Sequence, residues 1–414
     1  MANKPNTRAI GNLFSFLFCA KMNHFEIREI PGKGRAMVAT KSYATDEIIF
    51  EEEPFVSSQF SWNAAYGYAA CDHCMRPLET VLENVRRLAS DAKLEVPLLQ
   101  HDPTASWAAQ FTQCQRCKVR YCSEDCLMEA QKRYHRVACM GAFRADDTHP
   151  INVLNETWKK MHYPPETGTI MLIVRLMAMY QQSSKKSEFL EQLQSFQALI
   201  VNREQKIYHK MLGENFEQQM DQLYGAFCKA FAAEEFAMFT TPDAFKTLMG
   251  IMGTNSQGIA TSVLAQWVTK VSDLSLPDAD KTALDTVIDD LYSKVGEFAG
   301  EFLNNEGSGL YLLQSKINHS CVPNACSTFP YSNDIVVLKA LAPIQEGDEI
   351  CISYLDECML ERSRHSRHKV LRENYIFVCQ CLKCLAQASD PDVTSDDDED
   401  DDEMDDYEDD DDMN

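Results

Sequence analysis

Most residues of this chain that could do chemistry are cysteines in close pairs. The chain has 16 cysteines among 414 residues, and thiolate sulfur is a preferred ligand of zinc. A pair with two residues between its members suits a reverse turn. A pair with three residues between them lies on one face of a helix, so both kinds can converge on one ion. The first cluster comprises Cys71, Cys74, Cys114, Cys117, Cys122, Cys126, His135 and Cys139.

Eight ligands are enough for two tetrahedral zinc ions. We expect an interleaved arrangement, with Cys71, Cys74, Cys122 and Cys126 on one ion and Cys114, Cys117, His135 and Cys139 on the other. So small a module has little hydrophobic core, so the metal would supply its folding energy. The alternative, that these are buried cysteines with no metal, is weaker because all eight residues fall in pairs at zinc-ligand spacing.

A second cluster near the C-terminus supplies only three thiolates, where a structural zinc site needs four. The three are Cys379, Cys381 and Cys384. Cys321, in the stretch NHSCVPNA, is the candidate for the fourth ligand. Zinc there would fasten the C-terminal segment over that stretch. The cysteines that compete for this role are Cys326, Cys351 and Cys358.

Spending this many cysteines on metal rather than on disulfides indicates an intracellular protein, in the cytoplasm, the nucleus or both. A weak signal-peptide shape precedes them: Lys4 and Arg8, then an apolar run over residues 13–20. We set it aside because the cysteine spacings indicate zinc. The run is too short to span a membrane, and no 18-residue apolar stretch occurs elsewhere, so no membrane association is expected.

The elements that position these residues alternate between strand and helix patterns. Strand-like alternation covers residues 24–60, with a turn at PGKG, and returns at residues 334–341 and 349–354. Helical periodicity covers residues 154–305, and a basic helix-like stretch covers residues 361–375. The strand-rich segments are far apart in the sequence. One α+β domain split by insertions therefore fits better than a string of separate domains.

The net charge of −24 is unevenly distributed. Residues 390–412 hold 17 acidic side chains and no basic one, and without them the net charge is only −7. Such a block of like charge cannot bury a core, so we expect residues 386–414 to form a disordered acidic tail. Its role is either solubility or the attraction of a basic partner.

Three motifs together resemble a known family. NHSCVPN, GDEICISY and YIFVCQCLKC match the pattern of SET-domain protein lysine methyltransferases. The first cysteine cluster resembles a MYND zinc finger, although the 39-residue gap after Cys74 is longer than usual. The whole chain thus looks like the SET and MYND domain-containing (SMYD) family. It resembles a divergent member that ends in an acidic tail.

The resemblance implies an α+β fold: a β-rich SET domain with a pseudoknot, interrupted by a MYND zinc finger and a helical insertion. A zinc-binding post-SET segment would follow. The expected segments are 22–60 for the first SET part, 71–139 for the finger with a long internal insertion, 150–305 for the helical insertion, 306–356 for the second SET part, 357–385 for the post-SET segment and 386–414 for the tail. Three zinc ions, all structural, are expected.

The resemblance also implies S-adenosylmethionine as methyl donor. The residues that match the family's cofactor positions are Gly32, Lys33, Gly34, Asn255, Ser315, Asn318, His319, Tyr354 and Phe377. The catalytic candidates are Tyr354, expected beside the reacting methyl group, and Tyr375, expected to line the lysine channel. Taken alone, a GxG is usually a plain turn, a histidine is usually structural, and a tyrosine is often a core residue with a satisfied hydroxyl.

The expected function is methyl transfer to a lysine of a basic protein, such as a histone or a ribosomal protein. A proline-containing peptide is a further expected partner of the finger. The finger is basic but offers no base-reading helix, so direct nucleic-acid binding is not expected. Two alternatives compete. One is a non-catalytic interaction scaffold, and the other is a zinc-based ubiquitin ligase, in which the SET motifs would have no role.

The acidic tail yields a testable prediction. Deleting residues 390–414 should weaken engagement of a large basic substrate at low salt, because long-range attraction between opposite charges is lost. Methylation of a short peptide should stay intact. Measuring KM for both substrates over a salt series tests this. Unchanged activity on the large substrate at every salt concentration would contradict it.

Overall fold

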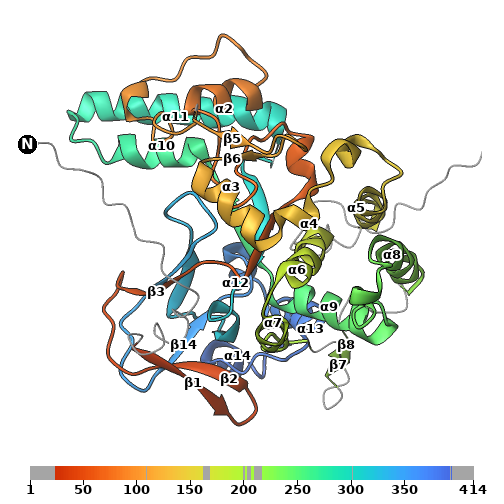
Figure 1. Cartoon of the computed structure of the whole chain (residues 1–414). Coiled ribbons are helices and arrows are strands. Elements are labelled where there is room, and N and C mark those ends of the chain that lie inside the picture. The colour runs from red at the N-terminus through yellow and green to blue at the C-terminus, as the bar shows by residue number, and fades with distance from the viewer. Residues whose placement is uncertain are drawn as a thin grey trace, which may run out of the picture.

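The structure is a computed structural model that describes residues 24–108, 110–161, 168–198, 201–202, 207–208, 217–300, 302–391 and 393. The apolar run over residues 13–20 and most of the predicted acidic tail lie outside the described residues. The predicted mixture of helices and strands is confirmed (Figure 1).

Three small sheets form the β-rich part of the fold. The first has the order β1 (Phe25–Ile30), β2 (Gly34–Ala39), β14 (Glu349–Ile352) and β11 (Asn318–His319). The second has the order β4 (Val56–Gln59), β10 (Asn305–Leu310) and β9 (Gln257–Thr261). The third has the order β12 (Ala325–Thr328), β13 (Val336–Ala340) and β3 (Ile48–Glu52). The cysteine-rich part adds a short hairpin of β5 (Thr112–Gln113) and β6 (Arg120–Tyr121).

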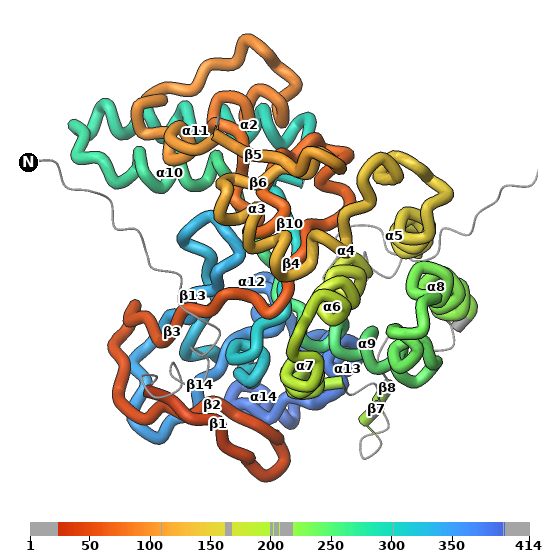
Figure 2. Tube along the Cα trace, in the orientation of Figure 1, coloured from red at the N-terminus to blue at the C-terminus, as the bar shows by residue number. Residues whose placement is uncertain are grey.

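Strands from the two ends of the chain share all three sheets. β2 pairs with β14, β4 with β10, and β3 with β13, in each case antiparallel. Figure 2 shows the red N-terminal strands and the blue C-terminal strands lying together at one end of the molecule. The prediction of one domain split by insertions is therefore confirmed. The boundaries proposed for its segments stay predictions.

Helices fill most of the chain between the two strand-rich parts. They are α5 (Pro150–Met161), α6 (Ile170–Gln182), α7 (Lys186–Gln194), α8 (Glu217–Ala230), α9 (Pro242–Asn255), α10 (Val263–Ser272) and α11 (Asp278–Ala299). The stretch predicted to be helical also contains β9 and a small hairpin of β7 (Val201–Asn202) and β8 (Ile207–Tyr208). Within the described ranges, no helix is both long and apolar enough to cross a membrane.

The long gap between the first two cysteine pairs holds a helix with a core of its own. Helix α2 (Val81–Leu88) begins at a capping box, in which the Thr80 hydroxyl accepts from the Glu83 amide and the Glu83 carboxylate accepts from the Thr80 amide. Its apolar face packs against α10 and α11, which lie beside it at the top of Figure 1. The insertion therefore extends the helical layer and leaves the cysteine pairs free to meet.

Three helices follow the last strand, β14. They are α12 (Glu357–Glu361), α13 (Arg364–Tyr375) and α14 (Leu382–Ala386). The basic helix predicted over residues 361–375 corresponds to α13. Ile376 ends α13 in the left-handed region, with φ of 63°, which turns the chain toward Phe377 and the last three cysteines.

The packing of α2 against α11 can be tested with two substitutions on one helix. Leu291→Ala removes a side chain that is 1% exposed, whereas Val287→Ala changes one that is 37% exposed. We expect Leu291→Ala to lower the free energy of unfolding by about 2–5 kcal/mol, because a buried cavity is left. Val287→Ala should change it by less than about 0.5 kcal/mol. Urea denaturation measures both, and equal effects would contradict this packing.

Candidate functional site

The structure brings the predicted metal ligands together in three groups of four. They are the two interleaved sets expected in the first cluster, and Cys321 with Cys379, Cys381 and Cys384. Within each group the ligand atoms all lie within 4.8 Å of one another. In the third group, Cys321 is therefore the fourth member, and the three competing cysteines are not.

The separations between ligand atoms fit zinc. A tetrahedral ion with zinc–sulfur bonds of about 2.3 Å holds its sulfurs about 3.8 Å apart. In the first group the Cys74 and Cys122 sulfurs are 3.7 Å apart, and in the second Cys114 and Cys139 are 3.8 Å apart. In the third, Cys321 is 3.6 Å from Cys384 and 4.0 Å from Cys379. The donor sets and their spacing thus suit three structural zinc ions.

A buried arginine that the sequence analysis missed lies against the third group. Arg367 on α13 is 0% exposed. Its Nε is 3.4 Å from the Cys321 sulfur, and its Nη2 is 3.5 Å from the Cys384 sulfur. Four thiolates around one Zn²⁺ carry a net charge of −2, and a cation hydrogen-bonded to two of them offsets part of it. Arg367 therefore stabilises the ligands in their thiolate form.

Tyr354 follows β14 and is held from both ends. Its hydroxyl donates to the carbonyl oxygen of Ile317 at 2.6 Å, and its backbone N–H donates to Nδ1 of His319 at 2.9 Å. The Tyr375 ring lies 4.7 Å from the Tyr354 ring, and the Phe377 ring lies 6.2 Å from it. Burial raises the pKa of Tyr375 to about 12 and that of Tyr354 further still. Both phenols are therefore neutral at physiological pH.

The predicted cofactor loop and the NHSC strand are joined by one carboxylate. Glu349 on β14 accepts from Lys33 Nζ at 2.5 Å and from Asn318 Nδ2 at 2.9 Å. The hydrogen bond to Glu349 also raises the pKa of Lys33. Gly32 and Gly34 have φ of 78° and 71°, which explains glycine there, and a Cβ at either would have no atom within 4 Å. The loop backbone is therefore open to close approach.

Two other predicted cofactor residues make backbone contacts. Asn255, at the end of α9, accepts from the backbone N–H of Gln197 at 3.1 Å and donates to its carbonyl at 2.7 Å. The Ser315 hydroxyl donates to the Leu312 carbonyl at 3.4 Å. Asn255 thus fixes the segment after α7 beside the site. A direct cofactor contact from either side chain stays a prediction.

Two cations that were not predicted converge next to Asn255 and the NHSC strand. Arg35 Nη1 donates to the Ser195 carbonyl at 2.8 Å, and Lys316 Nζ donates to the same oxygen. Burial, with a smaller contribution from Arg35, lowers the pKa of Lys316 to about 8. No motif distinguishes these two residues from ordinary surface cations, because their shared partner is remote in the sequence.

A buried carboxylate holds the short helix that leads into the NHSC strand. Glu52 on β3 accepts from the backbone N–H of Leu313 at 2.8 Å and of Gln314 at 2.9 Å. Burial raises the pKa of Glu52 to about 7, against the effect of these hydrogen bonds. Glu52 therefore anchors the 3₁₀ helix η8 (Gln314–Lys316), which places the Ile317 carbonyl under the Tyr354 hydroxyl.

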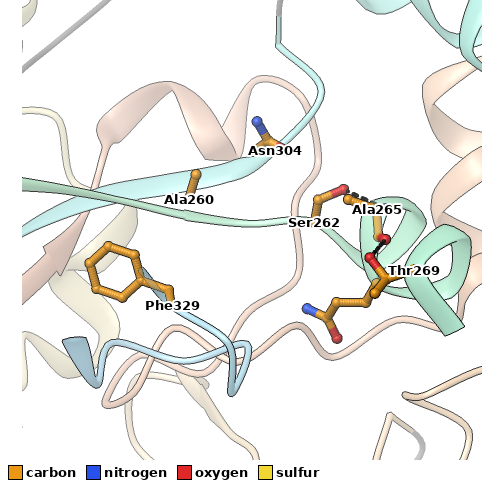
Figure 3. A pocket seen from close by; sticks show the side chains of 7 residues that line it. Ala260, Ser262, Ala265, Thr269, Asn304 and Phe329 are labelled. Atoms are coloured by element: carbon orange, nitrogen blue, oxygen red, sulfur yellow. Dashed lines mark hydrogen bonds between the residues drawn. The ribbon is translucent and has the colours of Figure 1, made fainter. Parts of the chain in front are cut away.

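A separate shallow depression of about 290 Å³ lies between β9, the start of α10 and Phe329 (Figure 3). Two of the polar side chains that line it are engaged within α10. The Ser262 hydroxyl caps α10 by accepting from the Ala265 amide at 3.1 Å, and the Thr269 hydroxyl donates to the Ala265 carbonyl at 2.9 Å. None of the predicted site residues lines this depression. Its lining offers no chemistry comparable to that around Tyr354.

Comparisons with known proteins agree with the resemblance to SET-domain proteins that the NHSCVPN and GDEICISY motifs indicated. The SET domain family matches residues 34–355. A relative from Gallus gallus named protein-lysine N-trimethyltransferase SMYD5 is 49% identical over 367 residues, which cover 88% of this chain and 87% of the relative. The Homo sapiens protein of the same name is 46% identical over 366 residues, covering 88% and 87%.

Two more remote matches were found. A SET and MYND domain-containing protein of Dictyostelium discoideum is 26% identical over 342 residues, covering 82% of this chain and 77% of that protein. Among solved structures, the SET domain of LSMT bound to lysine and AdoHcy matches with 12% identity and a TM-score of 0.29, covering 88% and 56%. That score is too low to add to the comparison.

The role of Arg367 can be tested against Arg372, an exposed arginine on the same helix. Arg367→Ala should release one zinc ion faster than the wild type, because two thiolates lose their charged donor and a buried site is left uncompensated. Arg372→Ala should release zinc at the wild-type rate. Zinc release into a chromogenic chelator measures both variants. The same rate for Arg367→Ala and the wild type would contradict the role.

Proposed function

The chain belongs to the SET and MYND domain-containing (SMYD) family of SET-domain proteins, and from this premise we propose that it is a protein-lysine N-methyltransferase that uses S-adenosylmethionine. Relatives that match 88% of the chain carry the name protein-lysine N-trimethyltransferase. The geometry of Tyr354 is the observation that carries the proposal. Its hydroxyl lies 2.6 Å from the Ile317 carbonyl and beside the rings of Tyr375 and Phe377.

The residues present fit the proposed cofactor. S-adenosylmethionine supplies an activated methyl group on a positively charged sulfur. The Tyr354 oxygen and the Ile317 carbonyl form a pair of partly negative atoms suited to a cation. The open backbone at Gly32 and Gly34 allows close approach of a ligand. In this proposal the loop over residues 32–34, the backbone of the NHSC strand and the Phe377 ring bind the cofactor.

The aromatic residues favour the neutral, reactive form of the substrate lysine amine. A lysine amine has a pKa of about 10.4, so its neutral form at pH 7 costs about 4.6 kcal/mol. A channel walled by Tyr354, Tyr375 and Phe377 lowers this cost, because an apolar surrounding disfavours the ammonium form. The Tyr354 hydroxyl donates its hydrogen bond to the Ile317 carbonyl, so the lone pairs of its oxygen are free to accept a hydrogen bond from the amine and orient it.

We further propose that all three metal groups hold structural zinc and that the substrate is a basic protein, such as a histone or a ribosomal protein. The first two groups would form a MYND finger that takes a proline-containing peptide. A protein with this many metal-bound thiolates would work in the cytoplasm or the nucleus. These points rest on the donor sets and on the family resemblance.

The competing candidate is a non-catalytic scaffold with the same fold. Calorimetry with S-adenosylmethionine separates the two, because a scaffold has no need of the cofactor. A folded, zinc-loaded protein with no measurable affinity for S-adenosylmethionine would contradict the methyltransferase proposal.

Methyl transfer itself is tested by incubating the protein and cell lysate with labelled cofactor and mapping the modified lysines. Tyr354→Phe should reduce transfer by at least about 100-fold, because it removes the oxygen that orients the amine but keeps the ring. Tyr331→Phe makes the same change at an exposed tyrosine, and transfer should stay at the wild-type level. Equal transfer by both variants would show that Tyr354 is not the reacting tyrosine.

A further inference from the structure

The two ring nitrogens of His319 contact two different parts of the site. Nδ1 lies 2.9 Å from the backbone nitrogen of Tyr354. Nε2 lies 3.3 Å from the sulfur of Cys321. The side chain is only 8% exposed, so water has little access to either contact. The imidazole therefore spans the space between the third metal group and the tyrosine proposed to be catalytic.

The contact with Tyr354 decides which nitrogen carries the proton. A backbone N–H can only donate, so Nδ1 of His319 must offer its lone pair. The proton of a neutral imidazole then resides on Nε2 and is directed at the Cys321 sulfur. A thiolate that binds a metal accepts such a hydrogen bond, in the way that outer hydrogen bonds orient metal ligands elsewhere.

Each of the two residues that His319 contacts makes a further hydrogen bond. On the metal side, Arg367 Nε lies 3.4 Å from the Cys321 sulfur. On the other side, the Tyr354 hydroxyl lies 2.6 Å from the carbonyl of Ile317, two residues before His319. Tyr354 is thus fixed at its amide by the His319 side chain and at its phenol by the carbonyl of Ile317, the residue just before β11.

We propose that His319 is a positioning residue that couples the third zinc group to Tyr354. This rests on the proposed function, and it assigns the His319 side chain a role other than cofactor contact. An intact zinc group holds the Cys321 thiolate in place, the thiolate orients the imidazole, and Nδ1 fixes the amide of Tyr354. Loss of the metal frees the imidazole, and the reacting hydroxyl loses its alignment.

Two substitutions of His319 each keep one of its two contacts and remove the other. His319→Asn places an amide oxygen where Nδ1 was, so it can still accept from the Tyr354 amide but cannot reach the Cys321 sulfur. His319→Gln places an amide N–H where Nε2 was, so it can still donate to the sulfur but leaves the Tyr354 amide without an acceptor. The readouts are kcat, the Kd for S-adenosylmethionine by calorimetry, and the rate of zinc release.

We expect His319→Gln to lower kcat by about 10-fold, the effect of one buried N–H left without an acceptor. Its cofactor Kd should stay within about two-fold of the wild type, and zinc release should be unchanged. His319→Asn should keep kcat within about three-fold of the wild type and should release one zinc ion faster, because only the sulfur contact is lost.

Three results would overturn the coupling: a wild-type kcat for His319→Gln, a loss that appears wholly in cofactor Kd, or equal kcat losses in both variants. Melting temperature and zinc content are recorded for each variant. If His319→Gln is unstable, the results for His319→Asn decide alone. Zinc release at the wild-type rate, or a kcat more than about three-fold below the wild type, then counts against the coupling. The proposed function is judged separately, because a wild type without methyl transfer contradicts that function, while zinc release still tests the Cys321 contact.

Discussion

The joining of Cys321 to Cys379, Cys381 and Cys384 is the contact on which the site depends. Across this junction the sulfurs of Cys321 and Cys384 lie 3.6 Å apart, although the two residues are 63 positions apart in the sequence. Zinc at this point would close a long loop and fix α14 and Phe377 against the NHSC strand. Without the junction, Tyr375 and Phe377 would have no fixed position relative to Tyr354. The positions of the aromatic side chains around Tyr354 therefore depend on this set of metal ligands as well as on apolar packing.

The cysteine-rich part is held to the sheets by buried polar contacts. Arg175 on α6 pairs with Asp72, between the first two cysteines, at 3.1 Å and donates to the Ser57 carbonyl on β4 at 2.7 Å. Its guanidinium lies 4.3 Å from the centre of the Tyr134 ring. A largely buried arginine is costly unless its donors are satisfied, and here the cysteine-rich part and the sheet satisfy them together. Docking of the finger is thus specific in its geometry.

Several polar side chains are buried around the site. Glu52, His319 and Arg367 are each almost fully buried, and each makes hydrogen bonds to groups remote in the sequence. Such networks rigidify their surroundings when they are fully satisfied. Tyr354 gains its fixed position from this network at its amide and at its hydroxyl. A rigid hydroxyl needs no reorganisation when it meets a substrate amine.

The sequence by itself determined the metal ligands, the split of the SET strands and the position of Tyr354. Ligand pairs two or three residues apart depend only on local turns and helices, so their spacing is a reliable signal of zinc. Three thiolates required a fourth ligand and made Cys321 the candidate, but the tertiary structure chose it over Cys326, Cys351 and Cys358. The NHSC and GDEICISY motifs located, through family resemblance, the strand that leads to the tyrosine proposed to be catalytic.

The tertiary structure alone decided how those residues are supported. Arg367 looks like any cation of a basic helix, and Lys316 like any lysine before a strand, until folding brings the Cys321 sulfur and the Ser195 carbonyl to them. The side chain of Asn255 likewise meets Gln197, 58 residues away, and the tautomer of His319 is set by the amide of Tyr354. The reason is physical: burial and hydrogen-bond partners come from contacts between remote segments, and no local pattern of residue types encodes them.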